Sequence, residues 1–150
     1  MLHLLYPDRT TLREDETLVR SCLDEFANLF FAYTSSQRLL TFKYQSPDKG
    51  SGAVMTFQHE HAMDDESPEL ESSELVQMDF IQEVQGVVMS YSNGSMFLFK
   101  VDSKEVEEVG VLPDGILTGS WAPNQEYLAI ASKSGKLLLF TPEFDVMHEA

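Results

Sequence analysis

Two stretches of the sequence carry the same hairpin pattern, and this pattern limits the chain's fold more than any other feature. In GVVMSYSNGSMFLFKV, residues 86–101, two apolar runs flank an Asn-Gly pair, and in EYLAIASKSGKLLLFT, residues 126–141, they flank a Ser-Gly pair. Asn-Gly between apolar runs favours a β-hairpin, because both turn residues can adopt positive φ there. We therefore expect antiparallel strands joined by turns at Gly94 and Gly135.

The two hairpins belong to one longer repeat. Superposing Gly94 on Gly135 gives an offset of 41 residues (135 − 94) without a gap. Equivalent residues of a structural repeat occupy equivalent places in the core. We therefore assign four repeat-equivalent aromatic residues to the core; they are Phe80, Phe99, Trp121 and Phe140.

A third copy precedes these two, at residues 28–44. It aligns with Gln37 on Gly94, an offset of 57 residues (94 − 37), so it has 16 more residues (57 − 41) before the next copy. These extra residues coincide with an acidic segment that has no lysine or arginine from His59 to Glu74. Its acidic residues are Glu60, Asp64, Asp65, Glu66, Glu69, Glu71 and Glu74. Such a composition buries too little apolar surface to offset its ordering entropy, so we expect residues 58–75 to form a disordered insertion. It is either a solvated loop or an acidic docking peptide.

A repeat of about 40–45 residues with four strands per unit is the size of a β-propeller blade. We therefore predict an all-β fold, a partial WD-like β-propeller of about three four-stranded antiparallel blades, in one domain over residues 1–150. The expected blades are approximately residues 17–57, 76–108 and 109–150. Gly-His and Trp-Asp dipeptides, which are typical of WD repeats, are absent, so the blades are degenerate.

Charge and cysteine content exclude several classes of function. The formal net charge is −15, from 25 acidic and 10 basic side chains, whereas nucleic-acid binding needs cationic groups that release counterions. We expect no direct nucleic-acid binding and no membrane binding by this chain. Cys22 is the single cysteine, so we interpret it as a structural residue in a reducing compartment and exclude an internal disulfide. The N-terminus has no secretory signal pattern, which favours a cytoplasmic location, with the nucleus as an alternative.

A search for catalytic motifs gives no enzyme hypothesis. The sequence has no phosphate-binding Gly-Lys-Ser/Thr loop, no His-Glu-x-x-His and no Gly-x-Ser-x-Gly. His59 and His61, beside acidic residues, could form a metal site, but ligands on a disordered loop must first be ordered. We therefore expect no catalytic, metal-binding or cofactor-binding residues, and no small-molecule substrate.

The C-terminal unit, residues 109–149, resembles the Elongator complex protein 1 (IKAP) family, in its N-terminal β-propeller. The shared features are Val109-Gly110, Gly115-Ile116, the Trp-Ala-Pro-Asn-Gln-Glu run from Trp121, and the closing Phe144-Asp145-Val146. This family continues through further blades, so the resemblance implies that the chain is a fragment.

The resemblance also implies a function. It implies a non-catalytic scaffold of the Elongator complex, which modifies wobble uridines of tRNA, with other Elongator subunits as protein partners. The alternative is a generic WD-repeat interaction domain of another cytosolic assembly that recruits partners through the acidic segment. Removing residues 59–74 separates the two, because only the alternative requires a loss of binding.

Three blades leave strand edges and blade faces without neighbours, whereas propellers close with about 4–8 blades. We therefore expect the isolated 150-residue chain to elute as oligomer or aggregate in size-exclusion chromatography. A sharp monomer peak that does not shift with concentration, together with cooperative melting, would contradict the predicted architecture.

Overall fold

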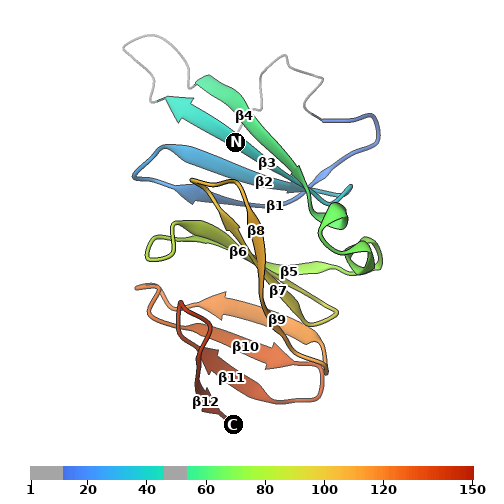
Figure 1. The fold of residues 1–150 in the computed structure, drawn as a ribbon, viewed down its shortest axis with the longest axis vertical. Coiled ribbons are helices and arrows are strands. Elements are labelled where there is room, and N and C mark those ends of the chain that lie inside the picture. Colours follow the sequence, from blue (N-terminus) through green and yellow to red (C-terminus); the bar gives the residue numbers. More distant parts are fainter. Residues whose placement is uncertain (1–11, 46–53) are drawn as a thin grey trace. The chain divides into compact units, whose positions relative to one another are not determined.

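The computed structural model of the chain describes residues 12–45 and 54–150. This part contains twelve strands in three four-stranded antiparallel sheets, in which strands adjacent in sequence are paired (Figure 1). The chain divides into two compact units, Met1–Glu71 and Ser72–Ala150. The predicted all-β, partial-propeller fold is confirmed at the level of its blades.

The first unit contains one sheet, in the order β1-β2-β3-β4. Its strands are β1 (Leu18–Asp24), β2 (Leu29–Thr34), β3 (Arg38–Gln45) and β4 (Val54–Ala62). Alternation of side chains along β2 and β3 places Phe30, Ala32, Leu40 and Phe42 in one buried cluster. The Phe30 and Phe42 rings pack with centroids 6.2 Å apart, as cross-strand neighbours do.

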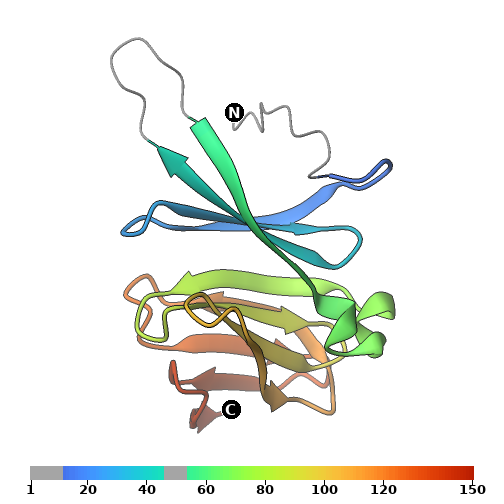
Figure 2. The same ribbon diagram turned by 45° about the horizontal axis from the view of Figure 1, so that its top comes forward.

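The second unit contains two sheets. The second sheet consists of β5 (Leu75–Ile81), β6 (Gly86–Tyr91), β7 (Ser95–Lys100) and β8 (Val106–Val111). The third sheet consists of β9 (Ile116–Trp121), β10 (Leu128–Ser132), β11 (Leu137–Phe140) and β12 (Val146–Glu149). Strand β9 lies against β5, so the two sheets pack face to face (Figure 2).

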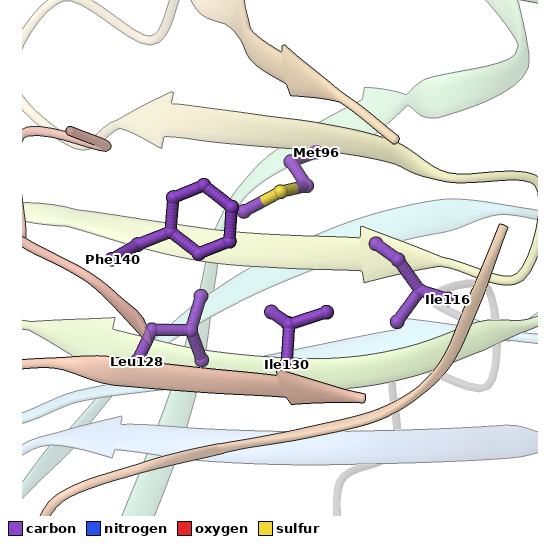
Figure 3. Packing of buried hydrophobic residues seen from close by; sticks show 5 residues of the cluster. All are labelled: Met96, Ile116, Leu128, Ile130 and Phe140. Atoms are coloured by element: carbon purple, nitrogen blue, oxygen red, sulfur yellow. The ribbon is translucent and has the colours of Figure 1, made fainter. Parts of the chain in front are cut away.

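Packing between the second and third sheets forms an apolar core. Met96 of the second sheet lies among four residues of the third sheet (Figure 3), which are Ile116, Leu128, Ile130 and Phe140. All five side chains are buried. Fully burying a side chain of this size contributes about 1.5–3 kcal/mol, so this cluster holds the two sheets together.

The strands reproduce the repeat that the sequence predicts. The first strands of the three sheets begin at Leu18, Leu75 and Ile116, which are separated by 57 (75 − 18) and 41 (116 − 75) residues. The three second turns also correspond, because Gln37, Gly94 and Gly135 have positive φ values of 57°, 99° and 90°. Gln37 therefore adopts the backbone conformation for which the other two turns use glycine.

The acidic segment differs from the expected disordered insertion. Strand β4 continues to Ala62, and two 3-10 helices follow it, η1 (Met63–Asp65) and η2 (Pro68–Ser72), shown in green in Figure 2. Met63 and Leu70 are fully buried. The expectation of disorder is wrong because these two apolar residues, spaced among the carboxylates, anchor a segment that is acidic on average.

The expected blade limits also shift. The first sheet extends past residue 57 to Ala62, and residues 109–111 belong to β8 of the second sheet. The connection from the first sheet to the second, residues 63–74, has twelve residues, whereas the connection from the second sheet to the third, residues 112–115, has four. This difference accounts for eight of the 16 extra residues. The other eight lengthen the β3–β4 hairpin relative to the β7–β8 hairpin.

The turn glycines make different demands on the structure. A Cβ on Gly94 would lie 1.8 Å from the carbonyl oxygen of Leu112, whereas a Cβ on Gly135 would meet nothing within 4 Å. We expect Gly94→Ala to destabilise the protein by more than about 3 kcal/mol, because φ strain and a backbone clash combine. Gly135→Ala, which introduces φ strain alone, should cost about 1 kcal/mol. Thermal melting of the two variants measures the difference, and equal melting temperatures would contradict this assignment.

Candidate functional site

The four predicted core aromatic residues occupy paired positions in the second and third sheets. Phe80 pairs with Val87, and Trp121 pairs with Leu128 in the same register. Phe80, Phe99 and Phe140 are buried, while Trp121 is half-buried. Trp121 packs against the Met96 cluster and against a second cluster, which consists of Ile81, Val88 and Leu98.

Gln77 links the two sheets through a buried polar contact. The side chain lies on β5 and is 4% exposed. With its amide oxygen facing β9, it accepts a hydrogen bond from Trp121 Nε1 at 3.2 Å, and its amide nitrogen donates to Ser90 Oγ at 2.8 Å. The indole N–H of the half-buried Trp121 therefore has a hydrogen-bond partner between the two sheets.

A second polar link comes from Gln125, in the β9–β10 turn. Its Oε1 accepts a hydrogen bond from the backbone N–H of Gln82 at 3.0 Å, and its Nε2 donates to the backbone carbonyl of Phe80 at 2.8 Å. This side-chain amide therefore pairs with the backbone at the end of β5 as a neighbouring peptide group would. Together, Gln77 and Gln125 fix how the third sheet lies on the second.

In each sheet, a polar residue lies two positions before the first strand. Its side chain forms a hydrogen bond with the turn between the second and third strands, or with the ends of those two strands. In the third sheet, Asp114 Oδ2 accepts from Ser134 Oγ at 2.9 Å. In the second, Ser73 Oγ contacts Ser92 Oγ and accepts from Asn93 N, both at 3.0 Å. In the first, Glu16 accepts from Thr34 and Arg38.

Sequence reasoning missed these residues, although their spacing identifies them. Glu16, Ser73 and Asp114 are separated by 57 (73 − 16) and 41 (114 − 73) residues, which are the offsets of the repeat. A search restricted to apolar and glycine positions could not find them. Because the three residues differ in type, only their spacing indicates that they are equivalent positions of the repeat.

The strongest of these links is the ion pair between Glu16 and Arg38, which are both buried. Arg38 Nε donates to Glu16 Oε2 at 2.9 Å, and Arg38 also pairs with Glu60 at 3.1 Å. The hydrogen bond from Arg38 lowers the pKa of Glu16 from 4.5 to about 2, against the opposing effect of burial. The same bond raises the pKa of Arg38.

The acidic segment brings histidines and carboxylates together without assembling a metal-binding set. His61 Nε2 lies 2.9 Å from Glu66 Oε1, and Glu60 is engaged by Arg38 and by Arg13, the latter at 3.6 Å. In residues 12–45 and 54–150, no group of three or more His, Cys, Asp or Glu side chains is placed to hold a metal ion. Cys22 lies half-buried on β1.

Two carboxyl groups of the second sheet have raised pKa values. Burial raises the pKa of Asp79 on β5, partly opposed by the hydrogen bond from Phe80 N. Repulsion from Glu143, in the β11–β12 turn, raises the pKa of Glu83 in the β5–β6 turn. Each shift therefore has a local cause, burial or a like charge.

The third sheet presents exposed apolar side chains that its repeat equivalents bury. Leu117 and Leu137 are 63% and 49% exposed, whereas Val76 and Met96, which lie 41 residues earlier, pack in the core with the third sheet. Strand β10 lies between the strands that carry these two leucines. We call the side of the sheet that carries Leu117 and Leu137 the open face of the third sheet.

None of the helices in the described ranges has the length and apolar character needed to cross a membrane.

Comparison with protein families identifies the fold's relatives. The family model described as ELP1 first N-terminal beta-propeller matches residues 4–150. Elongator complex protein 1 of mouse is 28% identical over 82 residues, as is that of rat, and that of rabbit is 27% identical. These matches cover 55% of this chain and 6% of each relative, so the chain corresponds to a small part of their length.

Solved structures support the same fold. Sqt1 from Chaetomium thermophilum superposes with a TM-score of 0.52 and 18% sequence identity. The match covers 76% of this chain and 27% of that chain. At this identity the likeness concerns the fold alone.

The Glu16 carboxylate predicts how stability depends on pH. Because its pKa is lower in the folded than in the unfolded state, its stabilisation is present above pH 4.5 and lost as the pH falls towards 2. We expect this loss to be about 3 kcal/mol, and Glu16→Gln to remove it from the pH profile of melting. Glu126→Gln, an exposed position, serves as the control. A Glu16→Gln profile that remains parallel to the unmodified protein between pH 4.5 and 2 would show that this carboxylate does not carry the effect.

Proposed function

Because the chain belongs to the ELP1 first N-terminal beta-propeller family, we propose that it is a non-catalytic scaffold part of an Elongator complex. In this role it supports the modification of wobble uridines in tRNA through contacts with other Elongator subunits, in the cytoplasm. The observation that carries the proposal is the family match over residues 4–150.

Surface chemistry supports protein partners rather than RNA for this chain. The net charge of −15 disfavours close approach of a phosphate backbone, so tRNA contacts belong to other parts of the assembly. The open face of the third sheet offers apolar area of the kind that protein partners cover.

The alternative, an interaction domain of another assembly that recruits partners through its acidic segment, makes a different demand on residues 59–74. Deleting this segment is a poor test, because β4 continues to Ala62 and because Met63 and Leu70 are buried. Neutralising exposed and half-buried carboxylates keeps these anchors. A suitable combination is Asp64→Asn, Asp65→Asn, Glu66→Gln and Glu69→Gln.

We expect the full-length protein to co-purify with other Elongator subunits, and the neutralised variant to do so equally well. In cells that lack the protein, tRNA mass spectrometry should show loss of wobble-uridine modification, restored by either form. Restoration by the unmodified protein but not by the neutralised variant would favour recruitment through the acidic segment. If the protein does not co-purify with Elongator subunits and its loss leaves the wobble-uridine modification unchanged, the proposed function is wrong.

A further inference from the structure

The acidic segment contains a Ser-Pro pair at the turn between its two 3-10 helices. Ser67 lies between η1 and η2, and Pro68, which begins η2, is exposed. Ser67 is half-buried, and its hydroxyl makes no hydrogen bond to another side chain or backbone group in residues 12–45 and 54–150. We propose that Ser67 is a phosphorylation site for a proline-directed serine/threonine kinase, and that the added phosphate loosens the two 3-10 turns.

Other Ser-Pro or Thr-Pro pairs are less suited to this role. Thr141-Pro142 begins the β11–β12 turn, where Thr141 Oγ1 accepts a hydrogen bond from Asp145 N at 3.1 Å. The Thr141 backbone is further held by its N–H, which donates to the Asp145 carbonyl at 2.9 Å. The Ser46-Pro47 pair lies outside the described residues. Within residues 12–45 and 54–150, Ser67 is therefore the proline-directed site whose hydroxyl does not already support a turn.

The reaction is an ordinary phosphoryl transfer. The Ser67 Oγ attacks the γ-phosphorus of ATP, an Oγ–P bond forms, and the bond from that phosphorus to the β,γ-bridging oxygen breaks. ADP leaves, and the hydroxyl proton passes to the catalytic aspartate of the kinase. The kinase and ATP supply everything that the chain lacks.

Local charge determines what the phosphate does. Phosphoserine adds a charge of about −1.5 to −2 at pH 7, beside carboxylates and with no lysine or arginine in residues 59–74. Its acidic sequence neighbours are Asp64, Asp65, Glu66 and Glu69. His61, a basic side chain of this region, already pairs with Glu66.

A phosphate at a helix N-terminus is ordinarily favourable, by about 0.3–1 kcal/mol for a charge beside a full helix dipole. Here η2 has five residues, begins with Pro68, which has no N–H, and carries Glu69 and Glu71 itself. Repulsion among these like charges therefore outweighs the dipole, and phosphorylation loosens the segment.

The interactions that oppose this loosening are local ones rather than strand pairing. The segment is held by buried Met63 and Leu70 and by short backbone bonds, including Met63 N to the Gln37 carbonyl at 2.8 Å and Leu70 N to the Ser67 carbonyl at 3.1 Å. Strand pairing does not extend beyond Ala62. Added charge can thus open residues 63–72 while the sheets stay intact.

The test combines phosphorylation of the full-length protein with hydrogen exchange. The protein is incubated with ATP and a recombinant proline-directed kinase whose activity is verified on a synthetic peptide of residues 63–71. Mass spectrometry should find phosphate on Ser67 of the unmodified protein and no phosphate at this position in the Ser67→Ala variant. In the Pro68→Ala variant, phosphate on Ser67 should be at least tenfold lower. The matched control, Ser72→Ala, changes a neighbouring serine without a following proline and should be phosphorylated normally.

Phosphorylation should speed exchange of the amides of residues 63–72 at least tenfold and leave those of β6 unchanged. Phosphatase treatment should reverse the effect. Absence of phosphate on Ser67 while the peptide is modified would overturn the assignment of the site, as would full modification of Pro68→Ala. Phosphate on Ser67 with unchanged or slower exchange would overturn the proposed loosening. None of these outcomes depends on the proposed scaffold function.

Discussion

A four-stranded sheet with two apolar faces cannot bury both of them alone, and this constraint governs the structure of residues 72–150. Met96 of the second sheet is covered only because Ile116, Leu128 and Ile130 of the third sheet lie against it. Each buried side chain of this size contributes about 1.5–3 kcal/mol, so the sheets stabilise each other more than any hairpin stabilises itself. Stacking of repeated units is the general solution to this problem.

Apolar packing alone does not determine how one sheet lies on another, and polar contacts supply that specificity. Gln125 pairs with the backbone at Phe80 and Gln82, and Gln77 satisfies the Trp121 indole. A buried hydrogen bond contributes about 1 kcal/mol to the free energy of unfolding, and a buried donor or acceptor without a partner costs more than that. A shifted arrangement of the two sheets would leave these groups unpaired, so the polar contacts disfavour alternatives that the apolar residues would accept.

Much of the fold follows from the sequence, because the repeat is visible in residues with strict backbone or packing requirements. The turn positions Gln37, Gly94 and Gly135 identify the second turn of each sheet, and all three adopt positive φ. Phe80 and Trp121 have the same strand pairing, as their spacing predicts. Apolar periodicity and turn chemistry are local properties, which a single sequence records well.

The remaining features depend on contacts that no local pattern specifies. Composition predicts disorder for the acidic segment, but Met63 and Leu70 order it, and two residues barely change an average over sixteen. Glu16, Ser73 and Asp114 share a place in the repeat without sharing a side-chain type. At these positions the structure requires a polar side chain in a given place but no particular residue type. Only the spacing of the three residues therefore shows in the sequence that they are equivalent.

The open face of the third sheet shows how the same constraint connects fold and function. Leu117 and Leu137 take the repeat positions of Val76 and Met96, yet they remain largely exposed. A sheet built to the repeat's pattern carries an apolar face whether or not a neighbour covers it, because its strands alternate in the same way. Such exposed apolar side chains make contact with another apolar surface favourable. The alternation that forms the core between the second and third sheets therefore also leaves apolar side chains exposed on the third sheet.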